Sequence, residues 1–345
     1  MNKLSLLVLY GGASEEREVS IKSAREFARH LDTDKYAPIY VYIAREGFWS
    51  LADSPSDEPR RDTLAALSVN WMNKGLLVLR DGGFETLSVD VVFPMLHGKY
   101  GEDGIIQGVL EASGIPYVGC GVAASAVCMD KSLTSLVAAA AGVSAPRHII
   151  LYKNDDATSC GMRYPLFVKP ARSGSSFGVS KVYGPDTLPA AVEEARRYDD
   201  KVLVEEAIDG REIGCAVLGN GATLLTGALD QIELSGGFFR IHQEANPERG
   251  SQNATVTVPA PIPESSRELA ISAAKTVYRA VGCRGLARVD MFLTPDGRIV
   301  LNEINTMPGF TSYSRYPRMM ASAGIPMREL IDRLVDLALD NGDGL

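Results

Sequence analysis

One stretch, GLARVDMFLTPDGRIVLNEINTMPG (residues 285–309), combines a strong turn signal with a cluster of charged side chains. Two runs rich in apolar and β-branched residues, Leu286–Leu293 and Arg298–Ile304, flank the turn signal Pro295-Asp296-Gly297. This pattern is typical of a β-hairpin. Successive side chains of a strand point to opposite faces. We therefore expect one apolar face and one face that carries the charged residues.

The polar face of this hairpin gathers oxygen ligands. If the loop is the two residues Asp296-Gly297, Asp290 lies opposite Glu303 and Arg288 lies opposite Asn305. Two carboxylates and an amide oxygen are hard ligands of the kind that Mg²⁺ prefers. The alternative is an edge hairpin whose polar face is only solvated. The apolar residues around the hairpin favour a site.

Composition restricts the class of protein. With 345 residues the chain is long enough for two or three domains, and its formal charge of −8, without a Lys/Arg-rich block, argues against a nucleic-acid partner. Five cysteines without a CxxC pair indicate small buried residues in a reducing compartment. The apolar run Leu4–Tyr10 is too short to span a membrane and precedes no cleavage site, which predicts a strand and a cytoplasmic protein without a membrane partner.

The order of predicted elements indicates a parallel N-terminal sheet followed by α+β units. One glycine-rich turn follows Leu4–Tyr10, and a second, His97–Gly104, precedes a helix at Ile105–Ser113. This order of strand, turn and helix places backbone N–H groups at a ligand crevice. Neither turn matches the GxxxxGK[ST] or GxGxxG pattern. The strands expected next, 38–44 and 89–94, are separated by a polar segment, 54–63. We expect domains at 1–128, 129–218 and 219–345.

Two lysines stand at the ends of predicted elements. Lys169 ends the strand LFVKP and Lys131 begins a helix, and each taken singly is typical of a surface charge. The loop after Lys169, RSGSSFG (172–178), joins glycines with the hydroxyl groups of Ser175 and Ser176. Such a loop can lie close over a phosphate and donate hydrogen bonds to it. A plain Ser/Gly hairpin is the alternative.

The strand VLVEEAIDGRE (202–212) offers groups for a nucleotide base and a ribose. Backbone groups around Glu205, Ala207 and Ile208 could meet the edge of a base, and Glu212 could accept hydrogen bonds from ribose hydroxyls. Surface glutamates after a strand are common, so this signal is weak by itself.

Taken together, these residues resemble the ATP-grasp fold, in which ATP lies between two α+β subdomains. Five segments are similar to the D-alanine–D-alanine ligase family, and the similarity runs nearly end to end. The resemblance implies a three-domain ATP-grasp fold, α/β and α+β in class, with an N-terminal Rossmann-like domain. The segments are GGASEEREVS (11–20), HGKYGEDG (97–104), VKPARSGSSFGVSKV (168–182), GLARVDMF (285–292) and NEINTMPGFTSYS (302–314).

The resemblance also implies a role for each matched residue. ATP would phosphorylate the first D-alanine, and a nucleophile would then attack the acyl phosphate. A homodimer is implied as well. Glu16 would hold the ammonium group of the first D-alanine, with His97 nearby and Ser175 hydrogen-bonded to Glu16. Lys131 and Lys169 would bind the ATP phosphates, helped by Ser176, and two Mg²⁺ ions, or Mn²⁺ in their place, would be bound by Asp290, Glu303 and Asn305. Arg288 and the Gly309 backbone would form the oxyanion site, and Ser314 with Arg315 would hold the carboxylate of the second substrate.

A predicted mobile loop, residues 233–253, bears on the second substrate. Dipeptide-forming members carry a Glu-Lys-Tyr type segment there, whereas this loop reads GGFFRIHQEANPERGSQNA (236–254), with His242 in place of the tyrosine and Arg240 as a candidate for the missing lysine. The pattern resembles the D-alanine–D-lactate ligases behind high-level vancomycin resistance. An imidazole titrates near pH 6.5, so a partly cationic His242 would attract the carboxylate of D-lactate and repel the ammonium of a second D-alanine.

The leading hypothesis is an ATP-dependent D-alanine–D-lactate ligase of peptidoglycan synthesis, with consequences for cell wall biogenesis, cell shape and antibiotic resistance. One alternative is a D-alanine–D-alanine or D-alanine–D-serine ligase with an unusual loop. Arg17-Glu18 has the dipeptide-ligase form, although it contacts only the first substrate. Another alternative is a non-catalytic nucleotide-binding regulator, which predicts losses among the metal ligands or Arg288, and all of these are present.

Overall fold

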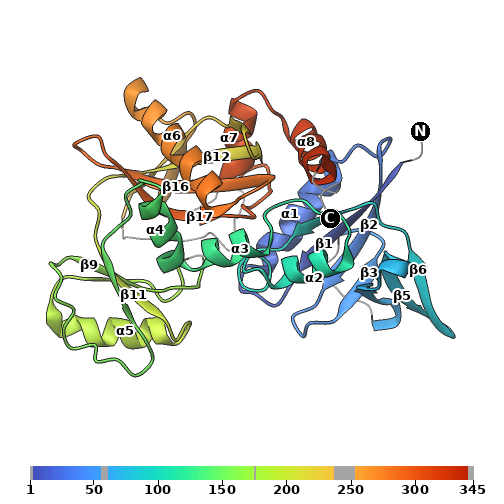
Figure 1. Ribbon diagram of the computed structural model, residues 1–345, viewed down its shortest axis with the longest axis horizontal. Helices are drawn as coiled ribbons and strands as arrows, with labels where there is room; N and C mark the ends of the chain where they lie inside the picture. Colours follow the sequence, from blue (N-terminus) through green and yellow to red (C-terminus); the bar gives the residue numbers. More distant parts are fainter. Residues whose placement is uncertain (1–2, 56–60, 175, 237–252, 341–345) are drawn as a thin grey trace.

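The computed structural model describes residues 3–55, 61–174, 176–236 and 253–340. Within them the chain forms three sheets, of seven, four and six strands, with helices packed against each (Figure 1). The α/β and α+β class expected from the sequence is confirmed.

The N-terminal sheet is built around the apolar strand at the start of the chain. Strand β1 (Leu4–Gly11) lies between β2 (Tyr36–Ile43) and β7 (Val91–Met95) and runs parallel to both. From Leu6 onward β1 is buried, because it has a neighbour on each side and apolar clusters on both faces. This position explains its unbroken apolar sequence.

Four antiparallel strands extend this sheet beyond β2, in the order β3, β4, β5, β6. The sequence predicted only a polar segment in this part of the chain. Each of the four strands is short and partly exposed, so it lacks the long apolar run that identified β1. They are β3 (Trp49–Ala52), β4 (Leu64–Leu67), β5 (Leu76–Arg80) and β6 (Gly83–Leu87), with the 3₁₀ turns η1 (Arg61–Thr63) and η2 (Trp71–Asn73) between them.

Helices from both ends of the described chain cover the N-terminal sheet. Helix α1 (Arg17–His30) and the much later α8 (Met327–Asp340) share one apolar cluster, in which Phe27 and Leu334 are fully buried (Figure 1). The hydroxyl of Tyr36 donates to Asp332 of α8 at 3.0 Å. Helix α2 (Ile105–Ser113) packs on the opposite face.

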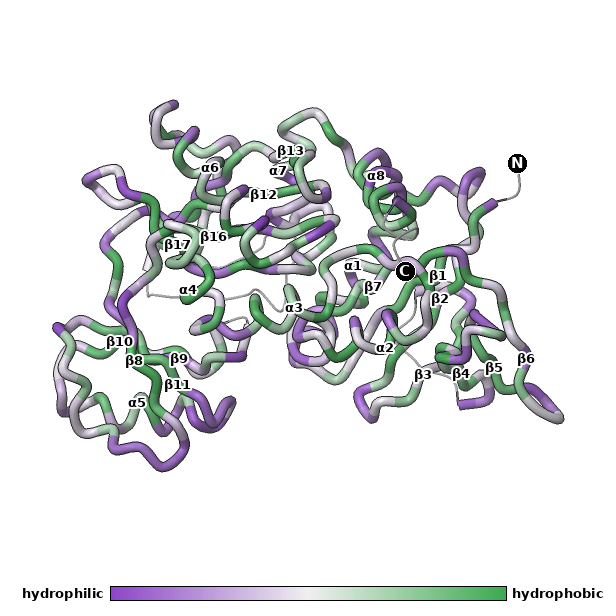
Figure 2. Tube along the Cα trace, viewed as in Figure 1, coloured by the Kyte–Doolittle hydropathy of each residue, from purple (hydrophilic) through white to green (hydrophobic). Residues whose placement is uncertain are grey.

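The central sheet has the strand order β10-β9-β11-β8, and all its neighbours are antiparallel. Val168, Val192 and Val202 form its core with helix α5, and its strands are apolar where the surrounding loops are hydrophilic (Figure 2). The elements of this region are α3 (Val122–Met129), α4 (Lys131–Ala140), β8 (His148–Leu151), β9 (Leu166–Pro170), β10 (Ser180–Val182), η3 (Pro185–Thr187), α5 (Leu188–Arg196) and β11 (Val202–Glu206).

The third sheet contains the predicted hairpin. Its strand order is β15-β14-β12-β16-β17, with β13 paired to β12, and helix α6 packs on one face through Ala274 against Val289 and Met291. The chain changes from the central to the third sheet between Glu206 and Arg211, and the domain limits at 128 and 218 stay a prediction. Its elements are β12 (Arg211–Asn220), β13 (Thr223–Thr226), β14 (Asp230–Leu234), β15 (Ala254–Thr257), α6 (Glu264–Val281), β16 (Leu286–Leu293), β17 (Ile299–Asn305) and α7 (Arg315–Ser322).

No single helix among the described residues is long and apolar enough to cross a membrane. Helices α3 and α4 meet the length and composition test only when taken as one pair bent by 106°.

Candidate active site

The hairpin β16–β17 has the register that the sequence predicted. Asp290 pairs with Glu303, and Arg288 pairs with Asn305. The apolar residues of β16, such as Val289, face helix α6, so the four polar side chains lie on the other face of the sheet. Asp290 and Glu303 are thus neighbouring carboxylates on adjacent strands.

The loop that produces this register differs from the one expected. The turn is a three-residue loop, closed by the Thr294 N–H donating to the Arg298 carbonyl at 3.0 Å, with Gly297 at a φ of 83°. This loop shifts the pairing by one residue. A β-bulge at Asn302, which has no partner between the Asp290 and Met291 pairs, shifts it back. The two-residue loop predicted from Asp296-Gly297 is therefore wrong, although the pairing inferred from it is right.

Asp290 is the centre of the polar face. Its side chain is 1% exposed, and it accepts hydrogen bonds from Arg288 Nε at 2.9 Å and Nη2 at 2.7 Å, and from Asn305 Nδ2 at 3.1 Å. Arg315 Nη1 lies 3.1 Å from its Oδ1. A buried carboxylate is tolerated only with such compensation. The two guanidinium groups therefore hold an ionised Asp290 in a fixed orientation.

Arg315 lies deeper in the protein than the sequence suggested. Its Nε and Nη2 donate to the two carboxylate oxygens of Asp230, each at 2.7 Å, and its Nη1 lies 3.4 Å from Glu212. Burial lowers the pKa of Arg315, but Asp290 and Asp230 outweigh burial and the net pKa is raised. Every terminal nitrogen of the guanidinium faces a carboxylate. Its binding of a substrate carboxylate stays a prediction.

The sequence did not single out Asp230, which is fully buried in β14. The available signal was its place beside Leu229 and two residues before Ile232, in a segment that is otherwise predicted to be a strand by its apolar residues. A charge at such a position indicates a buried partner of opposite charge.

The two predicted phosphate-binding lysines are largely buried beside the hairpin. Lys131 Nζ donates to the Ser173 carbonyl at 2.6 Å and lies 3.7 Å from Glu303. Lys169 Nζ lies 2.5 Å from Glu205. Burial lowers the pKa of Lys131, and the charges of Glu303, Lys169 and Glu205 also act on it. The alternative that both lysines are surface charges is wrong, because both side chains are largely buried.

Glu16 lies where three segments meet. It immediately precedes α1, and its carboxylate lies against the backbone of two glycines: a Cβ on Gly174 would stand 2.9 Å from Oε1, and a Cβ on Gly98 would stand 3.2 Å from Oε2. A side chain at either glycine would displace the Glu16 carboxylate from this position. Because Ser173, next to Gly174, also binds Lys131, the Glu16 site and the hairpin are continuous.

The glycine-rich turn 97–104 contributes two buried groups. His97 is 3% exposed, with Nδ1 2.9 Å from the Met307 carbonyl and Nε2 3.2 Å from Ser23 Oγ, and burial lowers its pKa. Glu102 accepts from the N–H of Met307 at 3.0 Å and from that of Gly98 at 2.7 Å. Burial, and then the charge of Glu16, raises the pKa of Glu102 to about 8. The sequence analysis placed Glu102 in the glycine-rich turn but assigned it no role.

The segment after β17 carries the remaining predicted substrate residues. A Cβ on Gly309 would stand 2.9 Å from Ser314 Oγ, so Gly309 and Ser314 are in contact. The Ser314 hydroxyl accepts a hydrogen bond from the Thr311 N–H at 3.1 Å, and Ser314 immediately precedes helix α7. The roles of Gly309 and Ser314 stay predictions.

The residues predicted for the nucleotide base lie between two sheets. Glu205 is in β11, and Ala207 and Ile208 follow it in the connection to β12, which contains Glu212. The Ala207 N–H donates to Pro165 at 3.3 Å. Ser176 is exposed in the loop before β10, with a φ of 59°. Three predicted residues, Ser175, Arg240 and His242, lie outside the described residues.

The donor set on the hairpin fits Mg²⁺. Mg²⁺ is held by one or two carboxylates and takes its other ligands from water and phosphates. Asp290 and Glu303 supply these carboxylates in register, and Asn305 adds an amide oxygen. In the part of the chain that the structure describes, no group of three or more His, Cys, Asp or Glu side chains is arranged to hold a metal by itself.

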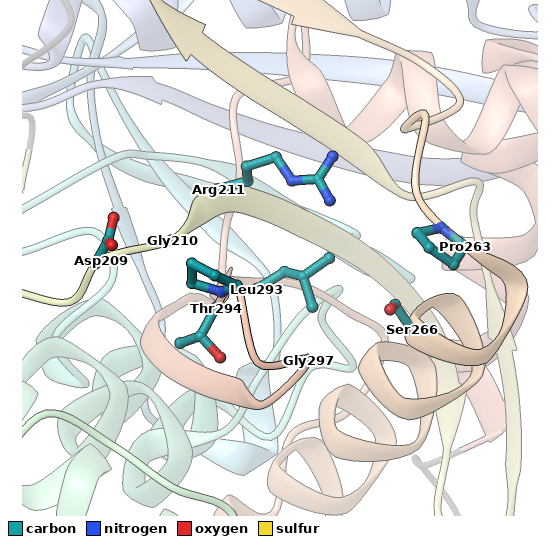
Figure 3. Close-up of a pocket in the computed structure, with 9 residues that line it drawn as sticks. Asp209, Gly210, Arg211, Pro263, Ser266, Leu293, Thr294 and Gly297 are labelled. Carbon is teal, nitrogen blue, oxygen red and sulfur yellow. The ribbon is translucent and has the colours of Figure 1, made fainter.

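A separate cavity of about 470 Å³ lies between the start of β12, the hairpin loop and the first turn of α6 (Figure 3). Arg211, Ser266 and Thr294 line it, and none of its lining residues belongs to the predicted site. The cavity therefore does not mark the cluster around Asp290.

The comparisons with known proteins agree with this geometry. Family models described as "D-ala D-ala ligase N-terminus" and "D-ala D-ala ligase C-terminus" match residues 5–120 and 139–336. The chain is 54% identical to the vancomycin/teicoplanin A-type resistance protein VanA of Enterococcus faecium, over 98% of this chain and 99% of that protein. It is 55% identical to a putative D-alanine–D-lactate ligase of Streptomyces coelicolor, with the same coverage.

A solved structure shows the same likeness in three dimensions. The VanG D-Ala:D-Ser ligase of Enterococcus faecalis superposes with a TM-score of 0.88 at 39% identity, over 98% of this chain and 100% of that chain. Two family models that together span most of the chain, full-length relatives above 50% identity and a shared fold lead to one conclusion. The chain belongs to the D-alanine–D-alanine ligase family.

Proposed function

We propose that this protein is an ATP-dependent ligase that joins D-alanine to D-lactate. The product, the depsipeptide D-Ala-D-Lac, supplies peptidoglycan precursors that resist glycopeptide antibiotics such as vancomycin. The observation that carries the ligase chemistry is the convergence of Asp290, Glu303 and Arg288 with the buried Lys131 and Lys169. The name of the Streptomyces coelicolor relative, at 55% identity, supports the choice of D-lactate, and the names of two relatives at 53–54% identity support a role in vancomycin resistance.

The first step transfers the γ-phosphoryl group of ATP to the carboxylate of D-alanine. ATP and Mg²⁺ are the cofactors of the family. Bound Mg²⁺ supplies positive charge to the phosphate oxygens. Lys131 and Lys169 hold the phosphates, and Glu16 holds the D-alanine ammonium against Gly98 and Gly174. Because these groups are fixed by buried contacts before the substrates arrive, little reorganisation remains for the reaction itself.

The second step forms the ester. The hydroxyl oxygen of D-lactate bonds to the acyl carbon of D-alanyl phosphate, phosphate leaves, and the hydroxyl proton is released. Negative charge develops on the former carbonyl oxygen during the attack. Arg288 and the Gly309 N–H stabilise that charge, and Ser314 holds the lactate carboxylate. Oxyanion donors of this kind are commonly worth 10² to 10³ in kcat.

His242 selects between the two nucleophiles. A second D-alanine must lose its ammonium proton before it attacks, whereas D-lactate carries none. We also infer that the site binds two Mg²⁺ ions, for which Mn²⁺ can substitute. We further infer a cytoplasmic homodimer without a nucleic-acid or membrane partner, whose three domains divide at 128 and 218.

A competition assay tests the proposed function. The enzyme receives ATP, Mg²⁺ and D-alanine with equal D-lactate, and both products are quantified from about pH 6 to 9. D-Ala-D-Lac should dominate at low pH and give way to D-Ala-D-Ala as His242 loses its charge. Dipeptide alone at every pH would assign a D-alanine–D-alanine ligase, and a parallel D-serine reaction tests that second alternative. An unchanged product ratio in His242→Tyr would remove His242 from the explanation.

A further inference from the structure

The oxyanion segment, defined here as Met307–Phe310, follows the last residue of β17 and contains Gly309. It is held from outside its own sheet. Side chains of the N-terminal part of the chain bind its first and last residues: Met307 through both of its backbone polar groups, and Phe310 through its N–H.

Ser23 joins two of these contacts. It is fully buried on helix α1, and its hydroxyl accepts from the Phe310 N–H at 3.1 Å and lies 3.2 Å from His97 Nε2. The other ring nitrogen of His97, Nδ1, lies 2.9 Å from the Met307 carbonyl, which can only accept. Nδ1 is therefore the donor, Nε2 is the acceptor, and the Ser23 hydroxyl gives its proton to Nε2.

Glu102 binds the same residue, Met307, through the backbone N–H. Its Oε1 accepts from the Met307 N–H at 3.0 Å, while Oε2 is bound to the Gly98 N–H at 2.7 Å. Met307 is thus fixed by two side chains, and Phe310 by a third. Gly309 lies between these two anchors, so their spacing sets where its N–H points.

We propose that Ser23, acting with His97 and Glu102, is a positioning residue that aims the Gly309 N–H at the oxyanion. This inference rests on the proposed function. A donor must stand 2.7–3.1 Å from the place where the negative charge develops, so a small displacement of the segment weakens the transition state without weakening the binding of ATP. Ser23 itself touches no reacting atom.

Ser20 provides a matched control on the same helix. It too is a fully buried serine of α1, and its hydroxyl accepts from the Gly11 N–H at 2.8 Å and donates to the Met95 carbonyl. Its two partners belong to β1 and β7, within the N-terminal sheet. Ser20→Ala therefore removes a comparable pair of buried hydrogen bonds without touching the oxyanion segment.

The experiment compares Ser23→Ala, Ser20→Ala and the natural enzyme in steady-state phosphate release. Ser23→Ala should lower kcat by at least about tenfold. This decrease is smaller than the 10²- to 10³-fold decrease in kcat expected when a whole oxyanion donor is removed. The KM for ATP should stay within about twofold, because the lysines that hold ATP are untouched. Ser20→Ala should keep kcat within about twofold, although its thermal midpoint falls as much as that of Ser23→Ala. Ser23→Thr, which keeps the hydroxyl, should recover most of the rate.

Affinity for a dipeptide phosphinate gives a second measurement. Its tetrahedral phosphorus carries an oxygen where the oxyanion forms, so its Kd should rise in step with the loss of kcat. A Ser23→Ala enzyme that matches Ser20→Ala in kcat, or that loses only ATP affinity, overturns the proposal. If Ser23→Ala does not fold, Glu102→Ala, which removes both acceptor oxygens, tests the other anchor with the same expectation. A natural enzyme that ligates neither D-lactate nor a D-amino acid would instead overturn the proposed function.

Discussion

The substitution Asp230→Asn tests the buried ion pair behind the hairpin. Asp230 is 0% exposed and Arg315 is 5% exposed, and two hydrogen bonds of 2.7 Å join them. Removing one partner from a buried pair costs about 3–5 kcal/mol, because the other charge is left uncompensated. Arg315 keeps Asp290 at 3.1 Å, which offsets part of the loss. We therefore expect a destabilisation at the lower end, about 3 kcal/mol.

An exposed pair of equal length provides the control. Arg333 and Glu329 on α8 are also 2.7 Å apart, but their side chains are 42% and 44% exposed. Water and salt screen such a helix pair, so Glu329→Gln should cost only about 0.3–0.5 kcal/mol. The contrast separates burial from distance, because the two pairs have the same N–O distance and differ in burial.

The measurement is urea unfolding at pH 7, followed by circular dichroism and by fluorescence. The free-energy difference is taken where the two probes give coincident transitions. A loss below about 1 kcal/mol in Asp230→Asn, or one no larger than in Glu329→Gln, would refute the reasoning that the buried charges depend on each other.

Three further substitutions give distinct outcomes. Folding raises the pKa of Glu102 from 4.5 to about 8, so the folded state retains a proton there and the stability of the natural protein falls as pH rises between these values. Glu102→Gln should remove a slope of at most about 1.4 kcal/mol per pH unit, measured by unfolding at pH 5, 6.5 and 8, and an identical slope in both proteins would contradict this assignment. Gly214→Ala should lower the thermal midpoint because its Cβ would stand 2.4 Å from Arg315 Nη2; an unchanged midpoint would show that the guanidinium moves freely. Glu205→Gln removes the partner of Lys169 at 2.5 Å and should raise the KM for ATP several-fold, and isothermal titration with ATP that finds equal affinity would exclude a role for this pair.

The hairpin shows how far the sequence could be taken. Strand alternation predicted which side chains share a face, and the pairing of Asp290 with Glu303 is confirmed. The loop length was wrong by one residue, and the bulge at Asn302 cancelled the error. A bulge leaves no clear mark in a sequence, because it depends on how the strand twists against its neighbours. The register was therefore right for a reason that the sequence could not supply.

Contacts between distant segments were harder to predict. The helix expected at Ile105–Ser113 after a glycine-rich turn is confirmed with the same bounds. The pairing of Asp230 with Arg315 and of Ser23 with Phe310 joins residues 85 and 287 positions apart. Local patterns do not specify such contacts, because they arise only when segments distant in the sequence pack together.

The position of α8 has a consequence for how the chain folds during its synthesis. Leu330 and Leu334 complete the apolar cluster that also contains β1 and α1, so the first sheet lacks part of its cover until the ribosome has produced α8. At about 5–20 residues per second, the roughly 210 residues between Ser113 and Met327 take about 10–40 s to make. During that interval an apolar face of the nascent protein is open to chaperones and to other nascent chains.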